Sequence, residues 1–124
     1  MFEDIEEDFV LPNTLNAMAK TFYVKTAIGL RQDDWYIKPG SRVTGVKVIA
    51  QGEKIHEVKR LIRDYPLSNG EYTEADDWHK VRGTALITNG YEEKFEEVHW
   101  YQCANIGKVE FKQKNWQKGD ENAD

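Results

Sequence analysis

The sequence contains a single cysteine, Cys103, among its 124 residues. One cysteine excludes an intrachain disulfide and a zinc site built from cysteines. It also fits a reducing compartment, so we expect a cytoplasmic protein in which Cys103 is an ordinary strand residue. No apolar run approaches the ~20 residues that span a bilayer, and the start, MFEDIEEDFV, lacks the basic and apolar regions of a signal peptide. We therefore expect a soluble chain with no export signal of its own and no membrane partner.

Histidines are also few, and they show no pattern that is typical of a metal site. His56, His79 and His99 form no HxH, HxxxH or HExxH motif, whereas a metal site needs at least three well-placed ligands. We expect neither a metal nor another cofactor. Nucleophilic catalysis by Cys103 has weak support, because His99 lies four residues along the same predicted strand, ~13 Å away and beyond hydrogen-bond reach.

Positive charge is in the minority, since 22 acidic residues outweigh 17 Lys and Arg and give a net charge of −5. The excess lies at the ends, with five carboxylates in residues 1–8 and three in residues 120–124, so the 14 remaining acids leave a body of about +3. We predict an acidic N-terminal segment over 1–11, a single α+β domain over 12–116 and an acidic tail over 117–124. Such ends are usually solvated. A second interpretation is that the N-terminal segment covers a basic site, in which case deleting residues 1–8 would strengthen RNA binding.

With 40% hydrophobic residues, the chain is globular, and its periodicity indicates helices followed by strands. Apolar spacing predicts a short helix over 12–22 and a second over 54–65, which Pro66 ends. Residues 43–50 are apolar enough for a buried strand. Three consecutive antiparallel strands over 80–114 complete the order. This order predicts an α+β fold, an antiparallel β-meander with one or two helices packed on one face.

The clearest pattern lies in residues 96–114, where apolar and polar residues alternate on both sides of a break at 104–107. A period of two is typical of a β-hairpin with one buried face. The simplest register has an even connection and pairs Cys103 with Lys108, Tyr101 with Glu110, and His99 with Lys112. Four apolar residues would then share the buried face: Val98, Trp100, Val109 and Phe111.

A second hairpin is predicted upstream, because Asn89-Gly90 is the strongest short-range signal of a two-residue turn. Pairing outward from that turn places Val81 opposite Val98, Lys80 opposite His99, and Arg82 opposite Glu97. Lys80, His99 and Lys112 would then form one row across three strands. A bulge would break this row.

The polar face of this predicted sheet gathers groups that suit metal-independent cleavage of RNA. That reaction needs an acid–base group near neutrality and cations that hold the phosphate. His99 supplies the first, because the ordinary pKa of histidine is about 6.5, and Glu110 or Tyr101 could be the partner base or acid. The predicted substrate contacts are Lys80, Arg82, Thr84, Lys108 and Lys112. Alternating Lys and Glu is also common on solvated sheet faces with cross-strand ion pairs, so that interpretation stays open.

Three motifs in this region resemble those of a known family. W-x-K-V-x-G at 78–83 is followed by V-H-W-Y at 98–101 and by I-G-K-V-E-F-K-x-K at 106–114. Over residues 43–114 the chain resembles the C-terminal domain of phage minor-capsid-type proteins and bacterial polymorphic toxins, which is grouped with ribonuclease-like toxins of the barnase, EndoU, colicin and RelE-like fold. The resemblance implies helices followed by an antiparallel sheet that carries a metal-independent ribonuclease-type site. It further implies that His99 is catalytic and that Lys80, Lys108 and Lys112 contact phosphate.

The acidic net charge favours a different class of function, a non-enzymatic binding protein. Such a protein would be a phage accessory factor or an acidic immunity-type protein that blocks the basic site of another protein. The expected partner is thus RNA in the first case and a protein, either an inhibited enzyme or a phage component, in the second.

Overall fold

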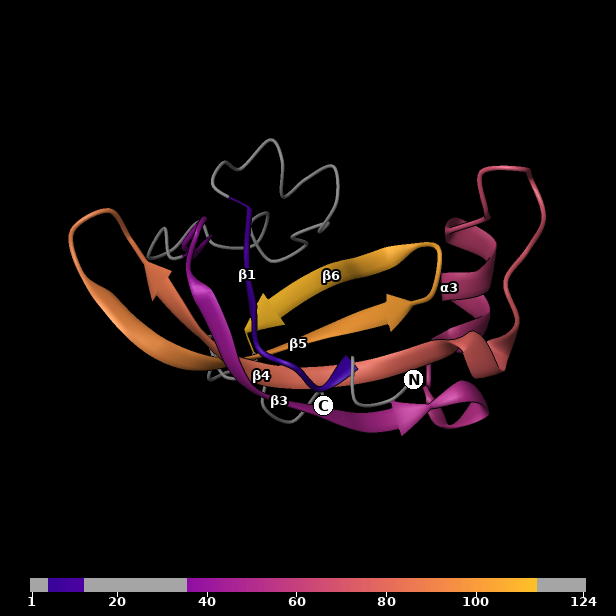
Figure 1. Ribbon diagram of the computed structural model, residues 1–124, viewed down its shortest axis with the longest axis horizontal. Helices are drawn as coiled ribbons and strands as arrows, with labels where there is room; N and C mark the ends of the chain where they lie inside the picture. Colours follow the sequence, from indigo (N-terminus) through magenta and orange to yellow (C-terminus); the bar gives the residue numbers. More distant parts are fainter. Residues whose placement is uncertain (1–4, 13–35, 114–124) are drawn as a thin grey trace.

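The computed structural model describes residues 5–12 and 36–113, and within them the chain is mostly antiparallel strands in a curled sheet (Figure 1). The strands are β1 (Phe9–Val10), β2 (Tyr36–Ile37), β3 (Arg42–Gln51), β4 (Trp78–Thr88), β5 (Glu93–Cys103) and β6 (Gly107–Gln113). They lie in the order β1-β3-β4-β5-β6, and β2 pairs with β4 beside this path. The predicted α+β class is therefore confirmed in a coarse sense, with strands dominating.

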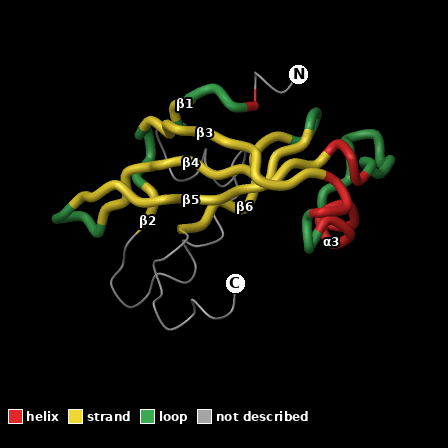
Figure 2. The backbone as a smooth tube through the Cα atoms, turned by 90° about the horizontal axis from the view of Figure 1, so that it is seen from below, coloured by secondary structure: helices red, strands yellow, loops and turns green. Residues whose placement is uncertain are grey.

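One α-helix of the described part, α3 (Val58–Asp64), follows β3 and a short 3-10 turn, η2 (Gly52–Lys54). A second 3-10 turn, η3 (Ala75–Asp77), leads into β4. Figure 2 shows α3 at one end of the sheet, opposite the end where the β4–β5 hairpin turns. The helix predicted over 54–65 is thus confirmed in a shorter form. The strand predicted over 43–50 is present as β3, but the prediction that it is buried is wrong, because most of its side chains are half-buried or exposed. The helix predicted over 12–22 falls almost entirely outside the described residues.

The two faces of the sheet follow from the alternation of side chains along β4 and β5. One face, called here the Trp100 face, carries Val81, Gly83, Val98 and Trp100. The other, called the His99 face, carries Lys80, Arg82, Thr84 and His99. All five residues predicted to be buried in this region are buried: Val81, Val98, Trp100, Val109 and Phe111.

The Trp100 face holds the larger core. The Trp100 and Phe111 rings stack with centroids 4.9 Å apart, and Phe9 of β1 meets Trp100 edge-on at 5.3 Å. Gly83 lies directly against this cluster, because a Cβ there would come within 2.9 Å of Val43 Cγ1 and 3.2 Å of the Trp100 ring. Only glycine therefore lets β3 and the indole approach so closely.

A second, smaller core lies between α3 and one end of the sheet. Its members are Ile55, Val58, Leu61, Trp78, Cys103 and Val109. Trp78 is paired with Cys103 across β4 and β5, and Val109 with Tyr101 across β5 and β6, so these side chains share the His99 face. The helix thus covers one end of the His99 face. It does not cover the part of that face that carries Arg82 and Lys112.

The β5–β6 register differs from the predicted one in two of three pairs. His99 is opposite Lys112 as predicted, but Cys103 is opposite Gly107, and Tyr101 is opposite Val109. The predicted pairs Cys103–Lys108 and Tyr101–Glu110 are wrong because the connection holds three residues, 104–106, and one extra residue is inserted as a β-bulge between Val109 and Lys112. Glu110 in this bulge has a φ of 61°. Val109 consequently faces α3 and does not share a face with Phe111.

The β4–β5 register is shifted by two residues from the predicted one. Thr88 pairs with Glu93, so the loop holds four residues, and Asn89 Oδ1 accepts hydrogen bonds from the Tyr91 and Glu92 amides. The predicted pairs Lys80–His99, Val81–Val98 and Arg82–Glu97 are therefore wrong: the observed pairs are Lys80–Tyr101, Val81–Trp100 and Arg82–His99. A shift of two keeps every side chain on its predicted face.

Part of the predicted acidic segment over 1–11 contributes to the sheet and its core. Phe9 pairs with Val43 of β3, Leu11 is buried, and Ile5 packs against the larger core. The Glu6 carboxylate accepts a hydrogen bond of 2.9 Å from the Val48 amide. Glu6 is thereby held along the edge of β3.

Candidate functional site

Four residues from four strands form one row on the His99 face. Lys47 of β3 pairs with Arg82 of β4, Arg82 pairs with His99 of β5, and His99 pairs with Lys112 of β6. We call these four residues the cationic row. It spans three strand spacings, about 14 Å. Arg82 therefore takes the place that the predicted register assigned to Lys80.

Lys47 is a member that the sequence pattern did not reveal, because 43–50 was interpreted as a wholly buried strand. Residues Thr44 and Lys47 are three apart on β3, whereas their partners Thr84 and Arg82 are two apart on β4, which marks a β-bulge. Gly45 lies in this bulge with a φ of 62°, a conformation that favours glycine. The sequence signal that could have revealed this bulge is Gly45 close to Lys47, the one lysine of the apolar run 43–50.

The cations of the row have no partner within the described ranges of the chain. Neither a hydrogen bond nor an ion pair engages Lys47, Arg82 or Lys112 there, and the same holds for Lys80 one pair further along β4. Like charges directly opposite each other, as Lys47 and Arg82 are, destabilise a sheet. Binding an anion would remove that repulsion. The row is therefore a concentration of positive charge on this face.

His99 is held by a carboxylate on its own strand. Its Nε2 lies 2.8 Å from Glu97 Oε2, and the imidazole side chain is 14% exposed. Residues two apart on a strand share a face, so this contact follows from local geometry. Thr84 lies opposite Glu97 and so places its hydroxyl group next to the row. The arrangement orients an acid–base group between two cations.

Comparison with known proteins was made for the whole chain. No protein-family model, curated protein or solved structure matches it. Within the described ranges, no helix combines the length and apolarity that crossing a membrane requires. The same ranges contain no group of three or more His, Cys, Asp or Glu side chains arranged to hold a metal ion.

Tyr101 lies between the cationic row and the smaller core. It is opposite Lys80, and it packs against the cluster beneath α3. Burial, aided by the negative charges of Glu57 and Glu110, raises the pKa of Tyr101 to about 12. The phenol therefore stays protonated near neutral pH, where it can donate a hydrogen bond but cannot act as a base.

Glu110 belongs to a different cluster from His99. Its carboxylate is 5% exposed and accepts two hydrogen bonds from Arg60, of 2.9 and 2.7 Å, and one of 2.8 Å from the Tyr65 hydroxyl. The hydrogen bond to Glu110 is the main reason that the pKa of Arg60 is raised. The β-bulge at Glu110 turns this carboxylate toward α3. The structure thus joins Glu110 to the helix and does not bring it to His99.

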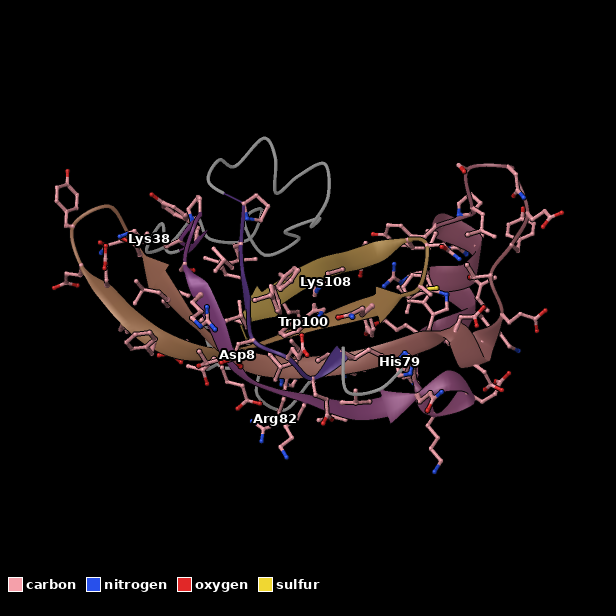
Figure 3. The ribbon with its side chains drawn as sticks, in the orientation of Figure 1. Asp8, Lys38, His79, Arg82, Trp100 and Lys108 are labelled. Carbon is pink, nitrogen blue, oxygen red and sulfur yellow. The ribbon has the colours of Figure 1, made fainter. Side chains whose placement is uncertain are left out.

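Lys108 lies on the Trp100 face, so its predicted position on the polar face with His99 is wrong. It is opposite Gln102, and its Nζ lies 4.4 Å from the centroid of the Phe9 ring. Desolvation lowers its pKa. Figure 3 shows Lys108 near Trp100 and Arg82 projecting from the other side of the sheet. The three-residue connection before β6 causes the difference, because an odd loop reverses the face of the residues that follow it.

Cys103 is buried beneath α3, with 2% of its surface exposed. Burial raises the pKa of its thiol to about 12, so the thiolate that nucleophilic catalysis requires is not formed near neutral pH. The structural role that the sequence suggested for Cys103 agrees with this position in the core.

Proposed function

We propose that this chain binds RNA on the His99 face and cleaves it without a metal ion, with His99 as the acid–base group. The observation that carries the proposal is the cationic row, in which three cations without partners in the described residues flank an imidazole held by a carboxylate. Phosphate contacts of this kind dominate the affinity of proteins for nucleic acids. The resemblance of residues 43–114 to toxin-type ribonuclease domains is consistent with this assignment.

Each residue of the site has a role that its position allows. Arg82 and Lys112 lie directly beside His99 and would stabilise the negative charge that builds on the scissile phosphate. Lys47 and Lys80 would bind neighbouring phosphates and fix the strand in register. The Thr84 hydroxyl would donate a hydrogen bond to a phosphate oxygen.

The proposed reaction uses the 2′-hydroxyl of RNA as the nucleophile. In this proposal the His99 imidazole, oriented by its contact with Glu97, accepts the 2′-hydroxyl proton. The O2′–P bond then forms as the P–O5′ bond breaks, and the departing oxygen takes a proton from water. The products are a 2′,3′-cyclic phosphate and a 5′-hydroxyl. DNA lacks the 2′-hydroxyl and would bind without being cut.

The test is cleavage of a mixed-sequence RNA in the presence of EDTA. His99→Gln should lower the cleavage rate by about 10²-fold or more, because it removes the group that transfers the proton. The fold should persist, since glutamine is similar in size to histidine and its amide can still donate a hydrogen bond to Glu97. His56→Gln is the matched control, because His56 is exposed and lies outside the row. Absence of cleavage across a broad panel of RNAs, or equal cleavage by wild type and His99→Gln, would contradict the proposal.

A non-enzymatic binding protein is the alternative that the net charge of −5 favours. A phage accessory factor or an acidic immunity-type protein would use its carboxylates and would have no need of the cationic row. The two proposals separate in one measurement: Arg82→Ala should weaken RNA binding under the first and leave protein binding unchanged under the second.

A further inference from the structure

Phe95 is an exposed aromatic residue on the same face of the sheet as His99. It lies four residues from His99 along β5, toward the β4–β5 hairpin, and 70% of its surface is accessible. Its cross-strand partner is Leu86, which is half-buried. We call Leu86 and Phe95 the Phe95 patch. Phe95 belongs to neither core cluster of the described residues, so the face of its ring is accessible to a ligand.

Charged groups of both signs surround the Phe95 patch on this face. Glu93 and Glu97 flank Phe95 along β5 and share its face. Glu93 forms an ion pair with Lys38, and Glu97 is bonded to His99. Lys38 therefore balances the charge of Glu93, whereas the charge of Glu97 remains while His99 is neutral.

We infer that Phe95 is a stacking site for a nucleobase of single-stranded RNA whose backbone lies on the cationic row. This inference rests on the proposed function and names the form of its substrate. Four residues of a strand span ~13 Å, so the stacked base belongs to a nucleotide beyond the one that faces His99. Bases in a duplex are stacked on one another and offer no free face to a side chain, whereas single strands do.

Charge and shape together favour RNA over a protein as the occupant. Phe95 lies on the same face as the cationic row, and the pair Thr84–Glu97 separates it from Arg82 and His99. Proteins hold single-stranded nucleic acids with aromatic rings on which bases stack and with cations that pair with phosphates. An apolar protein partner would gain from Phe95 but would leave the cations of the row without partners. Stacking of one base on an aromatic side chain changes affinity by roughly 5- to 150-fold.

The experiment measures binding of two fluorescent strands: a short single-stranded 2′-O-methyl RNA, which cannot be cut, and the same strand with abasic sugars in place of its nucleotides. Phe95→Ala should weaken binding of the base-bearing strand by roughly 5- to 150-fold and leave binding of the abasic strand unchanged. Phe95→Trp should retain the affinity, since it retains the stacking surface. Tyr72→Ala is the matched control, because Tyr72 is 65% exposed and lies in the loop between α3 and β4.

The outcomes distinguish this inference from the proposed function. Unchanged binding of the base-bearing strand by Phe95→Ala, together with a loss for Arg82→Ala, overturns the stacking site and leaves the RNA site standing. An equal loss for both strands also overturns it, because Phe95 would then act through the shape of the hairpin. If wild type binds neither strand at low salt, the proposed function falls and the inference falls with it.

Discussion

At the scale of single residues, burial decides what the polar side chains of the His99 face can do. Arg82 and Lys112 lie on the part of this face that α3 does not cover, whereas Tyr101 and Cys103 lie against or beneath the helix. Burial is the largest cause of the raised pKa at both Tyr101 and Cys103. The same strand, β5, therefore offers an acid–base group at His99 and two groups fixed in their neutral form further along.

These raised values predict that stability falls at alkaline pH. The pKa of Cys103 rises from 9.0 and that of Tyr101 from 10.0, each to about 12. Between pH 9 and 12 the folded chain thus holds protons that the unfolded chain has released. Each group lowers the free energy of unfolding by at most ~1.4 kcal/mol per pH unit there. In urea unfolding, Cys103→Ala should therefore lose less stability than wild type between about pH 7 and about pH 10.5.

Lys108 acts in the opposite direction, because desolvation lowers its pKa and the folded chain releases that proton first. Wild type and Cys103→Ala share this contribution, so their difference reports on the thiol alone. Tyr101→Phe provides an independent comparison for the phenol. Identical losses in wild type and Cys103→Ala would show that the buried thiol does not contribute.

At the scale of elements, the cluster of Arg60 and Glu110 joins α3 to β6. Glu110 has a left-handed φ of 61° and a nearly inaccessible carboxylate, a costly combination for a residue other than glycine. The two hydrogen bonds from Arg60 and the one from Tyr65 offset that cost. The bulge also turns Val109 into the core beneath the helix. The helix and the bulge therefore depend on each other.

Removing Arg60 should destabilise the fold strongly. Arg60→Met leaves the Glu110 carboxylate buried with Tyr65 as its remaining bonded partner of this cluster, and the expected loss is about 2–4 kcal/mol in urea unfolding. Adding Glu110→Gln to Arg60→Met should recover part of the loss, because a neutral amide costs less to bury than a charge. Arg63→Met is the matched control, since Arg63 is exposed and pairs with its neighbour Asp64. Equal losses for Arg60→Met and Arg63→Met would contradict a structural role for the cluster.

At the scale of the whole molecule, charge of opposite sign meets along the edge of β3. Glu6 bonds to the Val48 amide, next to Lys47 of the cationic row, and Asp8 lies 3.9 Å from Arg42. Glu6 and Asp8 thus lie near one end of the proposed RNA site. Their carboxylates oppose the approach of a polyanion to that end.

Neutralising these acids should strengthen RNA binding more cleanly than deleting residues 1–8, because the deletion would also remove Ile5 from the core. Glu6→Gln with Glu7→Gln should raise affinity several-fold at low salt, and the gain should shrink at high salt as screening increases. Glu53→Gln with Glu71→Gln changes the net charge equally at sites away from Lys47 and serves as the control. An equal gain from both pairs would show that only net charge matters and that the N-terminal segment does not shield the site.

Along β4 and β5, the alternation of residue types was enough to predict which side chains are buried and which share the His99 face. Val81, Val98, Trp100 and Phe111 are buried, and Arg82 and His99 lie together on the opposite face, as the period of two indicates. This prediction survives a register shift of two residues because strand faces repeat with that period. In β4 and β5, the burial of a side chain and the face on which it lies therefore follow from the local alternation alone.

Which residues become neighbours across the sheet was decided by the tertiary structure. Lys47 joins the row through a bulge at Gly45, and Lys108 leaves it through the odd connection before β6. The bulge at Glu110 then restores the pairing of His99 with Lys112, and it is bonded to Arg60, 50 residues earlier in the chain. Loop length and bulges depend on contacts between distant segments. Each adds or removes one residue from the register, a change that alternation within a single strand does not record.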